Sequence, residues 1–206
     1  MQHITRRASL CSVVCAAALT ALTTNMTMAA SLAERMRATE ERVAVKADSF
    51  KGCKFYESTL TEYIETASDF FYPYISYRLE DGDRFLFGYI RTESSDWIML
   101  NGVIVLVGEK RYAYYPAPLE ALAMRGSDCA SSYDGLRCTE WFNLPAKKGE
   151  ELFKMFTAIA DAPDSVPVKV RAAGSDGNSD WELNKDERQA WKDIVFYYLN
   201  FSQRTK

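Results

Sequence analysis

Residues 75–89 read ISYRLEDGDRFLFGY and decide the fold class of this chain. Ile75, Tyr77 and Leu79 alternate with polar residues, and Phe85, Phe87 and Tyr89 recur at every second position. Between the two sets, Asp81-Gly82-Asp83 has turn chemistry. A period of two places alternate side chains on opposite faces of a strand. The stretch therefore predicts a β-hairpin.

Further strands are predicted on both sides of this hairpin. Residues 51–77 have β composition, although 59–66 fits a short helix equally well. Trp97-Ile98-Met99-Leu100, the favoured turn pair Asn101-Gly102 and the apolar run 103–107 predict a second hairpin, whose run 103–107 is buried on both faces. Residues 111–115 continue the meander, and 136–142 add another strand.

The helices are predicted mainly in the second half of the chain. Residues 31–43 form an amphipathic N-terminal helix, a helix after Pro145 buries a stripe ending at Ile159, and the last helix spans 185–200. Between these two later helices, 166–172 alternates as a strand whose Pro167 favours a sheet edge, and 180–183 returns as another. We therefore expect an α+β fold: an antiparallel meander of about five to seven strands with two C-terminal-half helices on one face.

Residues 1–30 have the features of a signal peptide. Arg6 and Arg7 precede an apolar run at 10–22, and Met28-Ala29-Ala30 is small-residue cleavage context. The run is too short to span a bilayer, so we expect no stable membrane insertion. The prediction is cleavage near Ala29 or Ala30, a periplasmic or secreted location, and a single globular domain at 31–206; a buried helix is the alternative for 1–30.

Histidine usage excludes several reaction classes. His3 is the only histidine and lies in the predicted signal, so the mature chain cannot build Ser/His/Asp or Cys/His nucleophilic sites. The cysteines are too scattered for a zinc site, and no nucleotide-binding glycine motif is present, so we predict no metal and no cofactor. Lys+Arg (25) do not exceed Asp+Glu (28), which argues against nucleic acid as a partner. A catalytic site made of two carboxylates is not excluded by these observations.

Three cysteines remain after the predicted signal. Cys129 and Cys138 bracket a turn-rich stretch and are the favoured disulfide in an oxidising compartment. Cys53 is then a free thiol, buried in the favoured interpretation or paired with another chain. Pairing of Cys53 with Cys129 or with Cys138 stays open.

The stretch 176–187 resembles a calcium loop, with oxygen ligands at Asp176, Asn178, Asp180 and Glu187. Position six of such a loop needs glycine, and Trp181 stands there instead. The alternative is a turn, a short strand and a helix N-cap at Asn184, whose spacing to Glu187 is that of a capping box. The sequence favours this alternative over a metal site.

Aromatic residues supply two hypotheses about binding. One is a sugar-stacking or peptide-binding face formed by Trp97, Tyr112, Tyr114, Tyr115 and Trp141, although strand alternation turns about half of such residues into the core. The other concerns the last helix, where Phe196, Tyr197 and Phe201 lie off the buried stripe. These residues are either deeply buried or form a homodimer face.

From about Tyr72 to Leu199 the order of features resembles poorly characterised exported α+β domains of bacteria. The resembling stretches are Phe85-Leu86-Phe87-Gly88-Tyr89-Ile90, Trp97-Ile98-Met99-Leu100, Glu150-Glu151-Leu152, Val168-Lys169-Val170-Arg171 with Gly174, and the closing aromatic helix. Such domains carry no agreed activity, so the resemblance implies only the fold and an exported location.

The leading functional hypothesis is an exported, soluble, non-catalytic binding protein of the cell envelope, with a protein or envelope ligand. An inhibitor- or immunity-like role is a variant of it. The alternative is a hydrolase of envelope polysaccharide, which needs two carboxyls about 5 to 9.5 Å apart in one cleft, one of them partly desolvated.

Overall fold

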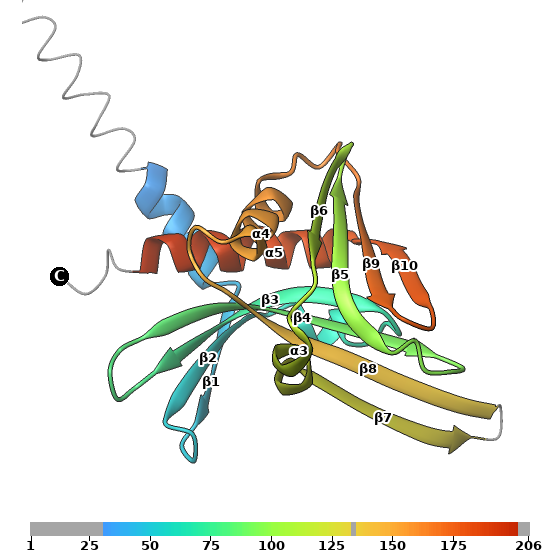
Figure 1. Ribbon diagram of the computed structural model, residues 1–206. Helices are drawn as coiled ribbons and strands as arrows, with labels where there is room; N and C mark the ends of the chain where they lie inside the picture. Colours follow the sequence, from blue (N-terminus) through green and yellow to red (C-terminus); the bar gives the residue numbers. More distant parts are fainter. Residues whose placement is uncertain (1–30, 133–134, 202–206) are drawn as a thin grey trace, which may run out of the picture. The chain divides into compact units, whose positions relative to one another are not determined.

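The computed structural model describes residues 31–132 and 135–201 (Figure 1), so the predicted signal at 1–30 lies outside the described residues. The chain divides into two compact units after Glu41. In the first unit, residues 31–40 are helical, which confirms the helix expected at 31–43 but ends it earlier. In the second unit, β1 begins at Val43.

Six antiparallel strands form the larger sheet. Their spatial order is β1 (Val43–Asp48), β2 (Cys53–Ser58), β3 (Phe70–Arg78), β4 (Arg84–Ser94), β8 (Gly135–Ala146) and β7 (Arg125–Ser132). The hairpin predicted from 75–89 is β3–β4, with Ile75 opposite Leu86. Phe71, Ile75, Leu86 and Ile90 are fully buried on the face that carries the helices. In β4 the buried side is therefore that of Leu86 and Ile90, whereas the alternating Phe85, Phe87 and Tyr89 are only half-buried on the other side.

Four further strands form a second antiparallel sheet in the order β10 (Asn178–Glu182), β9 (Val168–Gly174), β5 (Leu100–Val107) and β6 (Lys110–Tyr114). The turn predicted at Asn101-Gly102 is wrong, because β5 runs through both residues. The edge position predicted for the strand after Pro167 is also wrong. β9 is central, and Pro167 precedes its first residue, so no ladder hydrogen bond is lost.

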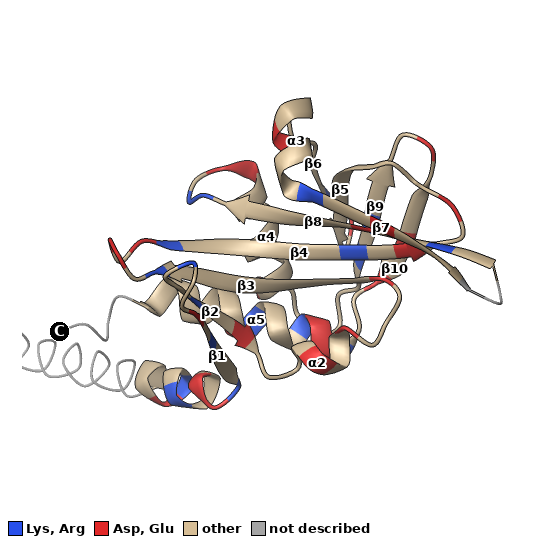
Figure 2. Cartoon of the chain, turned by 90° about the horizontal axis from the view of Figure 1, so that it is seen from below, with Lys and Arg blue, Asp and Glu red and all other residues tan. Residues whose placement is uncertain are grey.

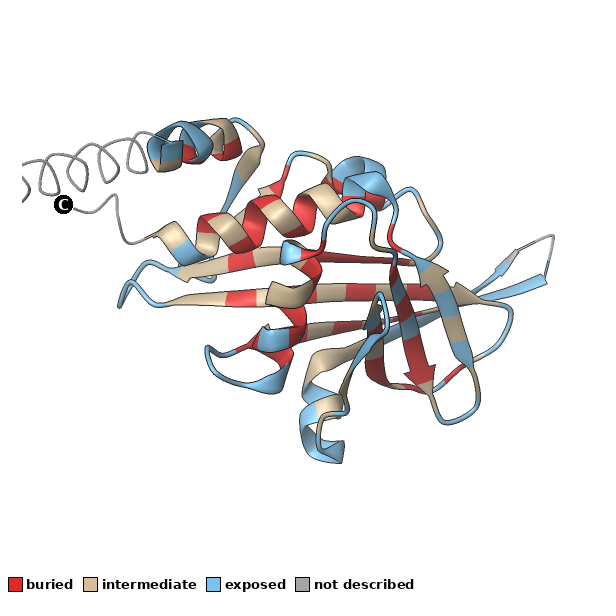
Figure 3. Cartoon of the chain, turned by 90° about the horizontal axis from the view of Figure 1, so that it is seen from above, coloured by how far each residue is buried: buried red, intermediate tan, exposed pale blue. Residues whose placement is uncertain are grey.

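Helices α4 (Glu151–Asp161) and α5 (Lys185–Asn200) lie in the angle between the two sheets (Figure 1). At their contact the indole of Trp191 packs on Phe71 and Phe156, with ring centroids 4.7 and 4.8 Å apart, and its Nε1–H donates to the Phe71 carbonyl. Figure 3 shows buried residues along α5 and the sheet strands that face it. This is the core on which both sheets rest.

Two shorter helices lie outside this core. α2 (Thr61–Ile64) confirms the helical alternative considered for 59–66. α3 (Pro118–Met124) has no buried residue and leads into β7. Among the described residues, we find no helix with the length and apolar character needed to cross a membrane.

The predicted α+β class is confirmed, with one difference in detail: the strands form two sheets rather than one meander. The structure also contains strands that were not predicted, because they lack large alternating apolar residues. β7, with the sequence RGSDCASS, is an example. Such a strand is specified by its ladder to β8 rather than by its own pattern.

A buried glutamate on β8 joins the two sheets. The carboxylate of Glu140, which is 2% exposed, accepts the backbone N–H groups of Ile98, Met99 and Leu100 at 2.9, 3.1 and 2.9 Å. Met99 has φ of 56°, in the left-handed region, so three successive amides point at one carboxylate. The chain therefore turns before Leu100, which is why the later Asn101-Gly102 makes no turn.

Candidate functional site

The predicted disulfide is present between Cys129 and Cys138, which lie directly opposite each other on β7 and β8 with Cα atoms 4.2 Å apart. The bond therefore crosslinks a strand ladder rather than an irregular surface loop. Cys53 is free and half-buried, and its thiol donates to the Lys51 carbonyl. The two other pairings considered for Cys53 are not formed.

The four residues of the calcium-loop alternative do not converge on one point. Asp180 is held by Arg171, and the Glu187 carboxylate accepts the N–H groups of Phe71 and Asn184 at 2.9 and 2.8 Å. The Asn184 side chain in turn accepts the N–H of Glu187, so the predicted capping box is present. No cluster of metal-ligating side chains occurs in the ranges that the structure covers.

The five aromatic residues predicted for a binding face are spread over four places. Tyr112 and Tyr114 pair with buried residues of β5 and lie on the helix-facing side of the small sheet. Trp141 lies on the far face of the large sheet, against Gly126, and Trp97 lies in the loop before β5. Tyr115 alone is more than half exposed, and its ring covers Gly102.

Of the off-stripe aromatic residues of α5, Tyr197 is buried, whereas Phe196 and Phe201 are half-buried. Tyr197 is 8% exposed and packs on Tyr56 of β2, and the Phe201 ring packs on Tyr56 and Tyr77. These contacts lie within one chain, as the burial interpretation expects.

A concave surface lies on the face of the small sheet turned away from the helices, and we call it the sheet groove. It encloses about 530 Å³, and all four strands contribute to its lining. That lining consists of Ile104, Leu106, Arg111, Lys169, Val170, Arg171, Asp180, Trp181 and Glu182. A volume of this size is typical of ligand sites.

Strand alternation builds the groove. In β5, Val103 and Val105 are fully buried toward the helices, so Ile104 and Leu106 point to the opposite face, where Leu106 is 36% exposed. In β9, Lys169 and Arg171 alternate with buried valines in the same way. The groove therefore has an apolar strip along β5 with basic side chains beside it.

The register places two bases on either side of Leu106. Arg111 is its partner on β6 and Lys169 its partner on β9. Within the described part of the chain, neither base has a hydrogen bond or ion pair, although Glu182 lies opposite Lys169 in the ladder. These two positive charges are therefore available to a ligand.

The third base of the groove is neutralised internally. Arg171 donates two hydrogen bonds of 2.6 Å to the carboxylate of Asp180. The bidentate hydrogen bond holds the pKa of Asp180 below its usual value and raises that of Arg171. Asp180 is therefore a fixed counter-ion.

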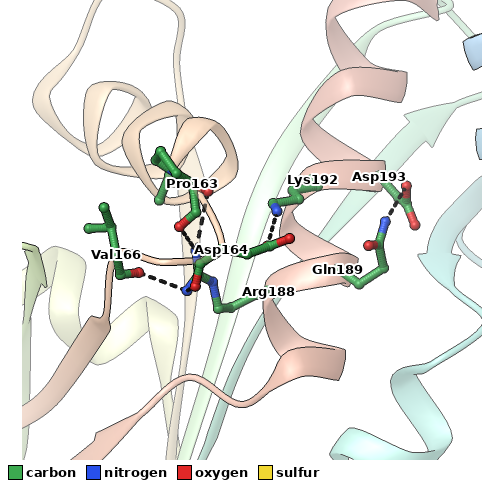
Figure 4. Close-up of polar contacts among 8 residues, drawn as sticks. Pro163, Asp164, Val166, Arg188, Gln189, Lys192 and Asp193 are labelled. Atoms are coloured by element: carbon green, nitrogen blue, oxygen red, sulfur yellow. Dashed lines mark hydrogen bonds and ion pairs between the residues drawn. The ribbon is translucent and has the colours of Figure 1, made fainter.

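A second, smaller hollow of about 330 Å³ lies beside α5 and is lined in part by Lys185, Arg188 and Lys192. Figure 4 shows the Arg188 guanidinium donating to main-chain carbonyls between Ala162 and Val166, with distances from 2.5 to 3.2 Å. Lys192 pairs with Asp164, which lowers the pKa of that carboxyl. These cations hold the loop between α4 and β9, so we assign this hollow to stability.

Neither of these two hollows is lined by residues of the large sheet. Seen from below in Figure 2, β3 and β8 carry few charges. Two acids on or beside this sheet are already engaged: Lys46 donates to Glu57, and the Tyr72 hydroxyl donates to Glu65, both at 2.7 Å. The hydrogen bond to Glu65 adds to burial in raising the pKa of Tyr72.

Sequence reasoning found part of the groove. The charged, solvated side of the strand carrying Lys169 and Arg171 was visible as alternation. Ile104, Leu106 and Arg111 were missed, because the run 103–107 is apolar throughout and hides which residues face out. Comparison of this chain with family models, curated proteins and solved structures gives no significant match.

Proposed function

We propose that this chain is an exported binding protein of the cell envelope that acts without catalysis, and that the sheet groove is its ligand-binding surface. The observation that carries the proposal is the apolar strip of half-buried Ile104 and exposed Leu106, flanked by Arg111 and Lys169 without counter-ions. Export rests on the signal features of 1–30 and on the Cys129–Cys138 disulfide, which is typical of oxidising compartments.

The carboxyls of the groove support binding better than hydrolysis. Asp180 and Glu182 lie on the same face of β10, about 7 Å apart at Cα. A carboxylate-pair hydrolase needs one carboxyl whose pKa is raised so that it can donate a proton. In Asp180 the pKa is lowered instead, and the acid with a raised pKa, Glu187, is 1% exposed and bonded to the main chain.

The shape of the groove favours a segment of a large partner over a small molecule. Sites for small molecules bury most of the ligand surface. Here the floor is one face of a single sheet, and the walls are long side chains such as Arg111 and Arg171. A ligand that contacts only this face buries one side, which suits a protruding segment of a macromolecule.

Site-specific photocrosslinking in the native host tests the proposal. A photoreactive amino acid replaces Leu106 in the groove, and the control replaces Val45, which is 54% exposed on β1. We expect a discrete crosslinked adduct from position 106 and none of the same mass from position 45. Absence of an adduct at 106 in protein recovered from the envelope would overturn the proposal.

A further inference from the structure

We infer that the sheet groove receives an acidic segment of a partner protein, in which an apolar side chain is flanked by carboxylates. The apolar side chain packs on Leu106, and the carboxylates meet Arg111 and Lys169. The inference rests on the proposed function, since it specifies the chemistry of the ligand at the same surface.

The spacing of the bases sets the spacing of the acids. Arg111, Leu106 and Lys169 are neighbours across three adjacent strands. Adjacent strands lie about 4.8 Å apart, so the two bases are about 10 Å apart at Cα with the leucine midway. An acidic, apolar, acidic order of contacts satisfies all three positions together.

The charge of the groove is opposite to that of the whole chain, whose formal net charge is −3. The positive charge of Arg171 is already neutralised by Asp180, its partner on the neighbouring strand β10. Against Arg111 and Lys169 stands Glu182 alone, without an ion pair to either. The groove thus retains a positive charge that an acidic segment complements.

The apolar strip distinguishes a protein segment from other anionic ligands. An anionic polysaccharide would neutralise the bases, but its hydroxylated rings would bury less of the apolar surface of Ile104 and Leu106 than an aliphatic side chain does. A bilayer surface is broad, and its headgroups would meet the rim of a hollow before its floor. A peptide segment supplies carboxylates and an aliphatic side chain from one chain.

Titration of the folded, disulfide-bonded chain with two synthetic peptides, followed by amide NMR shifts, tests this inference. In the first peptide glutamates flank leucine, and in the second glutamine replaces each glutamate. We expect shifts at Leu106 and Lys169 with the first peptide, weakened by added salt, and at least about fivefold weaker binding of the second.

Three variants test whether positive charge in the groove strengthens binding and negative charge weakens it. Arg111→Ala and Lys169→Ala should each weaken binding of the acidic peptide about two- to fivefold, and Glu182→Gln should tighten it about twofold, since it removes the opposing charge. All three side chains are exposed or lie on the open face, so the fold should persist. Lys148→Ala, an exposed lysine before α4, is the matched control and should change nothing.

Equal binding of both peptides, shifts outside the groove, or no shift would overturn the inference. A further result would also overturn it: the chain binds phosphatidylglycerol vesicles more tightly than the acidic peptide, and Lys169→Ala abolishes the binding to vesicles. The ligand would then be a lipid surface. An adduct at position 106 together with a failed peptide titration would leave the proposed function standing and remove this inference alone. No adduct at 106 would instead remove the proposed function.

Discussion

Replacing Glu140 with glutamine tests the link between the two sheets. The substitution keeps the size of the side chain but exchanges one carboxylate oxygen for an NH₂ group. In the native chain one oxygen accepts from Ile98 and Met99 and the other from Leu100. In Glu140→Gln, the amide oxygen can still accept hydrogen bonds in the place of one carboxylate oxygen. In the place of the other oxygen, the NH₂ group faces a backbone N–H, and two donors cannot form a hydrogen bond.

The expected cost follows from these three bonds. Hydrogen bonds to a charged acceptor contribute about 1.5 to 3 kcal/mol each, roughly twice as much as neutral ones. At least one amide loses its acceptor at a site where Glu140 is 2% exposed, and the remaining bonds become neutral. Relief from burying a charge offsets part of the loss. We expect the free energy of unfolding to fall by about 2 to 4 kcal/mol.

Urea unfolding followed by circular dichroism measures this change, with Glu109→Gln as the matched control. Glu109 is exposed in the turn between β5 and β6, so its substitution should change stability by less than about 0.5 kcal/mol. Hydrogen exchange of the Leu100 amide should also accelerate in Glu140→Gln. A loss below about 1 kcal/mol, or unchanged exchange at Leu100, would refute the account of the link.

Three further substitutions have defined outcomes. Burial raises the pKa of Glu187 above its usual 4.5. The native fold therefore binds the proton more tightly, and this carboxyl's contribution to stability is full below about pH 4 and is lost as pH rises through the folded pKa. Urea unfolding over a pH series should show the native chain losing stability relative to Glu187→Gln as pH rises, and a constant difference would contradict this. Replacing both Cys129 and Cys138 with alanine should lower stability by about 2 to 3 kcal/mol while the near-ultraviolet spectrum persists, and an unchanged melting temperature would argue against a stabilising crosslink. Gly174→Ala places a Cβ against the Ile98 carbonyl oxygen, within van der Waals contact, so we expect a loss of about 1 to 3 kcal/mol in the same assay, and a neutral result would mean that this contact is not tight.

Features encoded by neighbouring residues were predictable. The hairpin at 75–89, the capping box of Asn184 and Glu187, and the bounds of α5 each depend on residues a few positions apart, and the structure has all of them. Asn101-Gly102 has equally clear local chemistry, yet it lies within β5. There the three amides held by Glu140, some 40 residues away, set the path of the chain.

The candidate site was less predictable because it depends on register. Alternation shows that Lys169 and Arg171 share a face, but not that Leu106 separates Lys169 from Arg111. The five aromatic residues proposed for a binding face failed to assemble for the same reason. Aromatic content indicates strands, whereas the pairing of strands decides which rings face the core, and Tyr115 alone came to lie beside the groove's sheet surface.

The position of Trp191 near the end of the chain also has a consequence for the order of folding during synthesis. Phe71 and Phe156 are fully buried, and both rings pack on Trp191 of the last helix. A nascent chain that has emerged only as far as β10 lacks the side chain that fills the space between its sheets, and its aromatic residues stay in contact with water. Folding of this core is therefore completed only once α5 has left the ribosome.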